Sequence, residues 1–350
     1  MTGRSAAGQP DAVDLRRVSP DDSASLRACQ DVVEAVYAAD VRNLPAPPFE
    51  ELVAAVRTSR EAVRHELWLL TGADGPVGYA RATFSLRDNT DQCSVLITVD
   101  PAHRRQGHGR QLLEHLGTRA RDEGRRRLLA EVPEPLVDGS TAAGPAFARA
   151  VGAVRALDEV RRDLELDLVD DQRLDALEAE ARSRSGGYEL VSWVGRTPDE
   201  LVDEQAEMLS RMSVEAPLGD LEWEQERWDE ARVREQERLF AAQRRTRLVT
   251  AARETATGRL VAFTDIGVSQ LQVDPAYQWQ TLVLPGHRGH RLGLLVKVAN
   301  LRQLRREVPE ARRLVTWNAE SNTFMVGIND VLGFRPVERL VEWEYEVRAA

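Results

Sequence analysis

Cysteine is scarce in this chain of 350 residues, which contains only Cys29 and Cys93. Two cysteines are too few for a disulfide framework, and they lack the paired spacing of a zinc site. Long apolar runs are also missing, since no stretch approaches the roughly 18 residues of a membrane-spanning helix. The polar start Met1–Ser5 has no apolar signal-peptide core. We therefore expect a cytoplasmic protein without a metal site and without contact to a membrane.

Lysine is almost absent, because Lys297 is the only one among the 47 lysines and arginines. Lysine-based covalent catalysis therefore depends on this single side chain, which we expect at the surface or facing a phosphate. Arginine supplies the other positive charges, stays protonated and forms a fixed fork for anions. The net charge of −10 and the lack of a long basic stretch with interleaved aromatics argue against nucleic acid as the main partner.

One nine-residue segment, in contrast, occurs twice. Residues 101–109 read Pro-Ala-His-Arg-Arg-Gln-Gly-His-Gly, and residues 285–293 read Pro-Gly-His-Arg-Gly-His-Arg-Leu-Gly. A shift of 184 positions aligns their proline, histidine, first arginine and last glycine, and it places Arg291 opposite Gly107. This repeat indicates that the chain is a duplication.

The order of predicted elements supports two similar halves. With 42% hydrophobic residues, the chain has enough material for two cores. We predict one domain at 1–168, a linker helix at 169–187 and a second domain at 188–350. The charged segment 220–247 predicts one or two amphipathic helices. Strands and helices do not alternate as in βαβ units, so the predicted class is mixed α/β, with a mostly antiparallel twisted sheet flanked by helices in each half.

The repeated segments have the composition of phosphate-binding loops. Each follows an apolar run predicted as a strand and turns directly into a helix, so several backbone N–H groups face one way at the positive end of the helix dipole. In the first copy, Arg104 and Arg105 add charge-assisted donors. The spacing Arg104-x-x-Gly107-x-Gly109 differs from that of dinucleotide folds and the Walker loop, which disfavours hydride transfer and nucleotide hydrolysis. In the second copy, Arg291 either obstructs a pyrophosphate or points outward and adds a cation.

With this strand, loop and helix context, the sequence resembles the GNAT superfamily of N-acetyltransferases, in a tandem architecture similar to that of mycothiol synthase. The resemblance implies acetyl-CoA or another acyl-CoA as donor, bound without a metal. It also implies donor contacts from both loops, from a backbone N–H at the end of each fourth strand, and from one polar helix start. The implied residues are Val99, Arg104, Arg105, Gln106, Gly107, His108, Gly109 and Arg110, and then Val283, Arg288, Gly289, His290, Arg291, Leu292, Gly293 and Asn322.

The helix after the fifth strand carries a second pattern of many family members, Ser-Asn-x-x-Ala-x-x-Leu-Tyr-x-x-x-Gly-Phe. Residues 321–334 match it well, but Asn329 stands at the tyrosine position. The first half is weaker, with Ser140-Thr141 at the start and Ala148 in place of the tyrosine. Neither half therefore keeps the residue that, by resemblance, protonates the departing thiolate.

Acyl transfer to an amine needs a neutral, well-placed amine, donors for the oxyanion and a proton acceptor. Polar residues near the expected thioester favour the second half for chemistry, whereas the orthodox loop favours the first half for donor binding. In the first half the candidate base is Asp91, and the acidic run 158–180 is interpreted as exposed faces or an interdomain surface. The catalytic candidates of the second half are Asp274, Tyr277, Asn318 and Glu320.

The leading hypothesis is an acyltransferase that moves an acetyl or other acyl group from acyl-CoA to a small-molecule amine, by direct attack in a ternary complex. Two alternatives stay open. The missing tyrosines fit a non-catalytic acyl-CoA-binding or regulatory module. The relaxed second loop fits an acyltransferase that uses a carrier protein or an aminoacyl-tRNA as donor.

Overall fold

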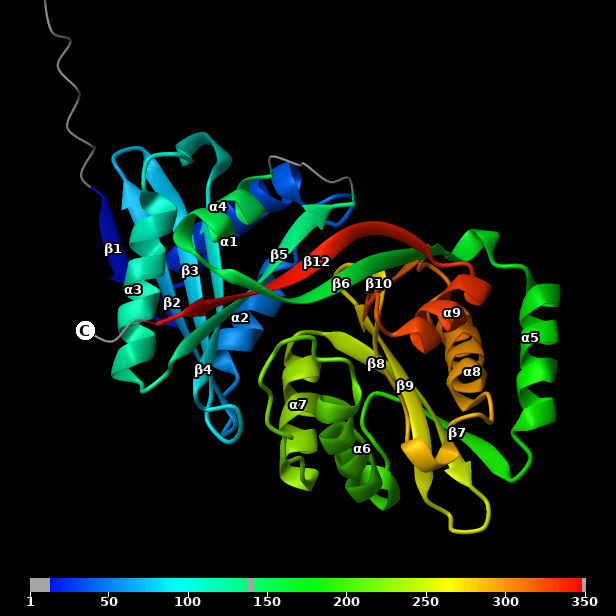
Figure 1. Ribbon diagram of the computed structural model, residues 1–350. Coiled ribbons are helices and arrows are strands. Elements are labelled where there is room, and N and C mark those ends of the chain that lie inside the picture. Colours follow the sequence, from blue (N-terminus) through cyan, green and yellow to red (C-terminus); the bar gives the residue numbers. More distant parts are fainter. Residues whose placement is uncertain (1–12, 137–141, 348–350) are drawn as a thin grey trace, which may run out of the picture.

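The computed structural model describes residues 13–136 and 142–347, which form two similar lobes (Figure 1). The first half contains β1 (Asp14–Arg17), α1 (Ser23–Asp40), α2 (Phe49–Arg57), β2 (Val63–Gly72), β3 (Gly75–Ser85), β4 (Gln92–Val99), α3 (His108–Asp122), β5 (Arg127–Pro135), α4 (Ala143–Val151) and β6 (Val154–Glu165). After α5 (Asp171–Arg184), the second half contains β7 (Tyr188–Val194), α6 (Val202–Glu215), α7 (Glu230–Ala242), β8 (Arg245–Glu254), β9 (Leu260–Ser269), β10 (Ala276–Val283), α8 (Leu292–Glu307), β11 (Arg313–Ala319), α9 (Thr323–Leu332) and β12 (Arg335–Glu346).

All these strands belong to one sheet, in the order β1-β2-β3-β4-β5-β12-β6-β11-β10-β9-β8-β7. Neighbouring strands are antiparallel except for the pairs β4–β5 and β10–β11. The predicted fold class, mixed α/β with mostly antiparallel strands, is confirmed.

The last strand of each half lies in the centre of the sheet, where the two halves meet. β6 pairs with β11 and β12 of the second half, and β12 returns to pair with β5 of the first. Figure 1 shows these two long strands running between the lobes. The boundaries at 168 and 188 stay a prediction, but each half of the sheet depends on a strand from the other.

Helices cover both faces of the sheet. On one face α1 and α2 pack on the first half and α6 and α7 on the second. On the other face lie α3 and α4, and then α8 and α9, with α5 packed along α8. None of the helices within the described ranges is long and apolar enough to cross a membrane.

The placement of Lys297 corrects the expectation of a surface or phosphate-facing side chain. Lys297 lies on α8 with only 2% of its surface exposed, and its ammonium is 5.5 Å from the centre of the Phe334 ring. Because α5 covers the outer side of α8, this helix is buried nearly all round. Its sequence therefore gives no clear polar face on which the lysine could be placed.

Two connecting segments on the face of α1 and α6 reach from their own half to contact the other, and we call them the crossing segments. Residues 41–48 follow α1, and the carbonyl oxygens of Arg42 and Asn43 each accept a 2.7 Å hydrogen bond, from Arg161 and Arg313 respectively. Residues 216–229 follow α6 and run in the opposite direction.

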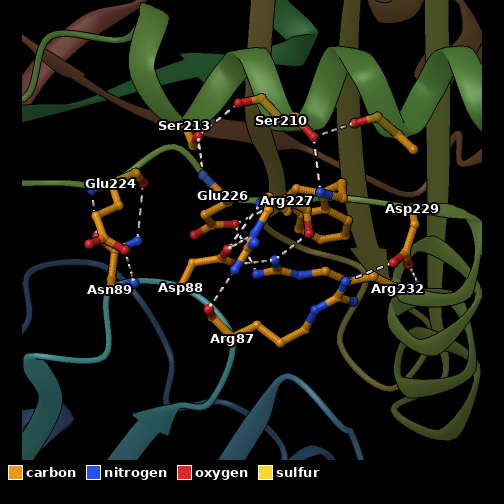
Figure 2. Close-up of polar contacts among 12 residues, drawn as sticks. Arg87, Asp88, Asn89, Ser210, Ser213, Glu224, Glu226, Arg227, Asp229 and Arg232 are labelled. Carbon is orange, nitrogen blue, oxygen red and sulfur yellow. Dashed lines mark hydrogen bonds and ion pairs between the residues drawn. The ribbon is translucent and has the colours of Figure 1, made fainter.

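The segment 216–229 is irregular, so the predicted helical structure over 220–247 is wrong before Glu230, and it is also wrong after Ala242, because β8 begins at Arg245. Its backbone and side chains bond the first half instead (Figure 2). Glu224 N donates to Asn89 Oδ1 at 2.7 Å. The buried carboxylate of Asp88 accepts from Arg227 Nε at 3.2 Å and from Arg232 Nη1 at 2.6 Å. Contacts to another part of the chain thus replace the helical hydrogen bonds.

Candidate functional site

The first repeated segment connects β4 to the N-terminus of α3. Arg105 and Gly107 adopt left-handed backbone conformations, with φ of 65° and 91°. No described side chain caps α3, so the N–H groups of its first turn are left for solvent or a ligand. Arg105 is exposed and has no hydrogen bond or ion pair to any described residue.

The second segment reproduces this backbone with the glycine at the other position. Gly289 and Arg291 are left-handed, with φ of 87° and 57°, and α8 also lacks a side-chain cap from the described residues. Each loop therefore carries one non-glycine residue in a conformation that costs of order 1 kcal/mol. The Arg291 guanidinium points to α5, where it pairs with Glu180 at 2.6 Å. Arg291 thus directs its charge to the linker helix.

The strand-end residues Val99 and Val283 lie where the sheet ladder opens. β4 pairs with β5 only over residues 92–94, and β10 pairs with β11 only over 276–277. Asp100 N donates to Val77 O at 3.0 Å, and hydrogen-bond directions alternate along an antiparallel pair, so the Val99 N–H points toward the β5 side. Leu284 N donates to Val261 O at 2.9 Å, which directs the Val283 N–H toward β11 in the same way.

The last glycine of each loop permits helix packing. A Cβ atom at Gly109 would lie 3.2 Å from Phe147 of α4, and one at Gly293 would lie 3.1 Å from Ile328 of α9. These positions explain the glycines without a ligand. A large residue there would first displace the neighbouring helix.

The other predicted donor contacts differ in availability. Gln106 and Arg110 are exposed, whereas Leu292 is buried, so only the backbone of Leu292 is accessible to a ligand. Burial lowers the pKa of His108, and His290 Nδ1 lies 3.3 Å from Arg184 O.

Asn322 is engaged within its own helix, since its Oδ1 accepts from Met325 N at 3.2 Å and caps α9. Ser140 and Thr141 lie outside the described residues.

The four catalytic candidates of the second half do not come together. Asp274 Oδ1 accepts from the backbone N–H groups of Arg312 and Arg313 at 3.0 and 2.8 Å, at the start of β11. Glu320 is exposed just beyond the other end of this strand. Because the strand has seven residues, its two ends are about 20 Å apart. Asp91 of the first half is also engaged, by Arg127 at 2.8 Å.

Tyr277 and Asn318 project from opposite faces of the sheet. The ring of Tyr277 stacks on Trp317 with ring centres 6.0 Å apart, and burial raises its pKa to about 12, so its phenol is protonated at neutral pH. Asn318 Oδ1 accepts from Asn329 Nδ2. Because Asn329 is fully buried, the residue at the tyrosine position forms an internal hydrogen bond.

A group of three carboxylates that the sequence analysis did not single out lies on the sheet between the two helix pairs. Glu131 on β5 pairs directly with Glu342 on β12, and Glu159 on β6 pairs with Leu340, two residues from Glu342. Strand alternation places all three on the face of α1 and α6. We call the part of the sheet around Glu131, Glu159 and Glu342 the central face.

The three glutamates lack salt-bridge partners among the described residues. None has a hydrogen bond or ion pair to another described residue, and no described group of His, Cys, Asp or Glu can hold a metal ion. Burial, and then the charge of Glu131, raises the pKa of Glu159 and of Glu342 to about 7. The pKa of Glu131 is also raised by its partial burial, although part of its side chain reaches solvent. The positive charge of Arg81 on β3 offsets part of this rise. The only trace of this group in the sequence is one glutamate within each of three strands, at a position where the side chain points to the face of α1 and α6.

Comparisons with known proteins match residues 64–147 to a family model described as an acetyltransferase (GNAT) domain. The chain is similar to a solved tandem GNAT protein from the clavulanic acid biosynthesis pathway, at 28% identity and a TM-score of 0.80, over 97% of this chain and 100% of that one. It is also similar to a GCN5-related N-acetyltransferase from Sphaerobacter thermophilus, at 18% identity and a TM-score of 0.64 over 98% of each chain, which shows the fold alone. No curated protein matches the sequence.

Proposed function

Since this chain belongs to the GNAT superfamily and carries that fold twice, we propose that it transfers an acyl group, in the simplest case acetyl, from acyl-CoA to a small-molecule amine. One observation carries the proposal. In each half, an uncapped helix N-terminus follows a strand whose last N–H points into an opened ladder. The helix end offers donors for a pyrophosphate, and the N–H of Val99 or Val283 offers one for the developing oxyanion.

The charges around the two loops favour the first half as the donor site. The first arginine of each loop is paired alike, Arg104 with Asp40 at 2.6 Å and Arg288 with Glu215 at 2.9 Å. In the second loop Arg291 is also paired, with Glu180 at 2.6 Å, so an additional carboxylate lies where a pyrophosphate would be repelled. Exposed Arg105 of the first loop has no such partner among the described residues.

The central face supports a cationic amine as acceptor. Glu131 follows the point where β5 leaves β4, so it flanks the opened ladder of the first half on the side opposite α3. An amine reaches the site mainly as an ammonium ion and must lose a proton before it attacks. A carboxylate whose pKa lies near 7, as for Glu159 and Glu342, can accept that proton. Asp274, Tyr277, Asn318 and Glu320 remain the competing proposal for the second half.

A matched pair of loop variants tests where the donor binds. Gln106→Glu and His290→Glu place the same carboxylate at equivalent positions next to the uncapped ends of α3 and α8. A negative charge there favours the helix but repels a pyrophosphate. We expect isothermal calorimetry to show acetyl-CoA binding weakened about tenfold or more by Gln106→Glu, which is about 1.4 kcal/mol, and by less than threefold in His290→Glu. The reverse ranking would move the donor to the second half, and no binding to the wild type would refute the proposal.

The pH dependence of the stability of Glu342→Gln tests whether the Glu342 carboxylate lacks a salt-bridge partner in the folded protein. A carboxylate whose pKa is raised on folding is nearly harmless at pH 4, where it is mostly protonated in both states, and destabilises the fold progressively as the pH rises from about 4.5 through 7. Glu342→Gln should therefore raise the unfolding free energy at pH 8 by at least about 1 kcal/mol, seen as a higher urea midpoint, and change it little at pH 4. Exposed Glu50→Gln on α2 is the control. Destabilisation of Glu342→Gln at pH 8 would instead indicate a structural ion pair.

A non-catalytic acyl-CoA-binding module is the second candidate. It is favoured by Ala148 and buried Asn329, because neither half has a hydroxyl at the family's tyrosine position. Acetyl-CoA binding without thiol release against a panel of cationic amines would support this candidate.

A further inference from the structure

Arg104, the first residue of the donor-loop motif, turns back toward its own strand and the helix on the opposite face. Its Nε donates to Val99 O at 3.3 Å. Its two Nη atoms donate to the two carboxylate oxygens of Asp40 at 3.0 and 2.6 Å, a bidentate geometry that gives both strength and direction. Three donors of the guanidinium are therefore committed within the protein.

The second half repeats this arrangement. Arg288 Nε donates to Val283 O at 3.2 Å, and Nη2 donates to Glu215 at 2.9 Å. The first contact is the more sheltered one, since the Arg104 side chain is 23% exposed and that of Arg288 is 55% exposed. The recurrence in two independently diverged sequences argues against a chance surface pair.

Both acids occupy the last position of their helix, directly before a crossing segment. Asp40 ends α1 and precedes residues 41–48, and Glu215 ends α6 and precedes residues 216–229. The segment 41–48 contacts the second half through Asn43 O, which accepts from Arg313 of β11. It also contacts β6 beside the central face, where Arg42 O accepts from Arg161. Arg104 and Asp40 thus join the donor loop to segment 41–48, which borders the central face.

We propose that Arg104 and Asp40 are positioning residues. They hold segment 41–48 to the donor loop, so that binding of the donor changes the mobility of this segment beside the central face. This inference rests on the proposed function for its ligand. In it, the pyrophosphate is held by the backbone of the loop, and Arg104 acts through Val99 and Asp40. Ordering of the loop by the donor then slows the opening of segment 41–48 over the central face.

Hydrogen exchange of residues 41–46 in the full chain tests this inference, with and without acetyl-CoA. In Asp40→Asn we expect exchange of this segment to be at least fivefold faster without ligand, while the urea midpoint is unchanged. Acetyl-CoA should slow the segment at least threefold in the wild type and have no such effect in Asp40→Asn. The acetyl-CoA dissociation constant should change less than threefold. Asp40→Glu should restore the wild-type pattern, and Asp31→Asn, an exposed change on the same helix, should preserve it.

Two results would overturn the inference. Unchanged exchange of residues 41–46 in ligand-free Asp40→Asn would remove the positioning role. A tenfold loss of acetyl-CoA affinity in Arg104→Gln, with normal affinity and normal exchange in Asp40→Asn, would make Arg104 a direct phosphate ligand. Failure of the wild type to bind acetyl-CoA is distinguishable from both, because it refutes the proposed function and leaves the ligand-free exchange result to decide the positioning role.

Discussion

Replacement of Arg161 by methionine is expected to cost the protein about 3–5 kcal/mol of unfolding free energy at neutral pH, the usual range for removing one partner of a buried ion pair. Arg161 lies on β6 with no exposed surface. Its guanidinium contacts Glu338 of β12, Asp163 at 3.1 Å and Arg42 O at 2.7 Å. Methionine keeps much of the volume but removes the salt-bridge partner of buried Glu338 and leaves Asp163 with Arg313 alone, at 3.5 Å.

The loss should be visible as a lower urea midpoint and should shrink at acid pH. Burial raises the pKa of both Asp163 and Glu338, and Arg161 lowers them. Without the arginine, the carboxylates destabilise the fold only when ionised, so acidification relieves the penalty. Adding Glu338→Gln to Arg161→Met should recover part of the stability. Arg155→Met is the control on the same strand, because this exposed arginine pairs at the surface and should cost less than 1 kcal/mol. An Arg161→Met midpoint as high as that of the control would contradict the prediction.

The location of Arg161 also shows why the fold was predictable and the strand exchange was not. The repeat, the turn residues and the apolar periodicity depend on local chemistry, and they predicted both the duplicated halves and most elements. The neighbour of a strand depends on contacts made some 180 residues away. The pairing of Glu338 with Arg161 is of this kind, and no pattern within either strand specifies it.

The candidate site shows the same division between local and distant information. The loops, their left-handed positions and the strand ends Val99 and Val283 follow from short segments that the family resemblance covers. Glu131, Glu159 and Glu342 were missed because each is a single glutamate within its strand, and only the exchanged sheet brings the three together. The loop sequence alone predicts Arg104 as a phosphate ligand, because its partner Asp40 lies 64 residues earlier in the chain.

Replacement of Lys297 by methionine is expected to stabilise the protein. Burial in α8 lowers the pKa of Lys297 to about 7, against about 10.5 for an exposed lysine. The unfolded chain therefore binds a proton that the folded chain resists, and this difference opposes folding fully below pH 7 and vanishes above the unfolded pKa. Methionine fits the same apolar surroundings, including the Phe334 ring at 5.5 Å from the ammonium, without a charge.

The pH profile separates this effect from a simple gain in packing. We expect Lys297→Met to add roughly 3–5 kcal/mol of unfolding free energy at pH 6.5, about 2 kcal/mol at pH 9, and little near pH 10.5, because each pKa unit corresponds to about 1.4 kcal/mol. Urea unfolding at these pH values measures the trend, with exposed Arg306→Met on the same helix as control. A gain that is independent of pH would indicate improved packing alone. A loss of stability at pH 6.5 would show that the folded protein satisfies the charged ammonium, and that the lysine is part of a polar site in the second half.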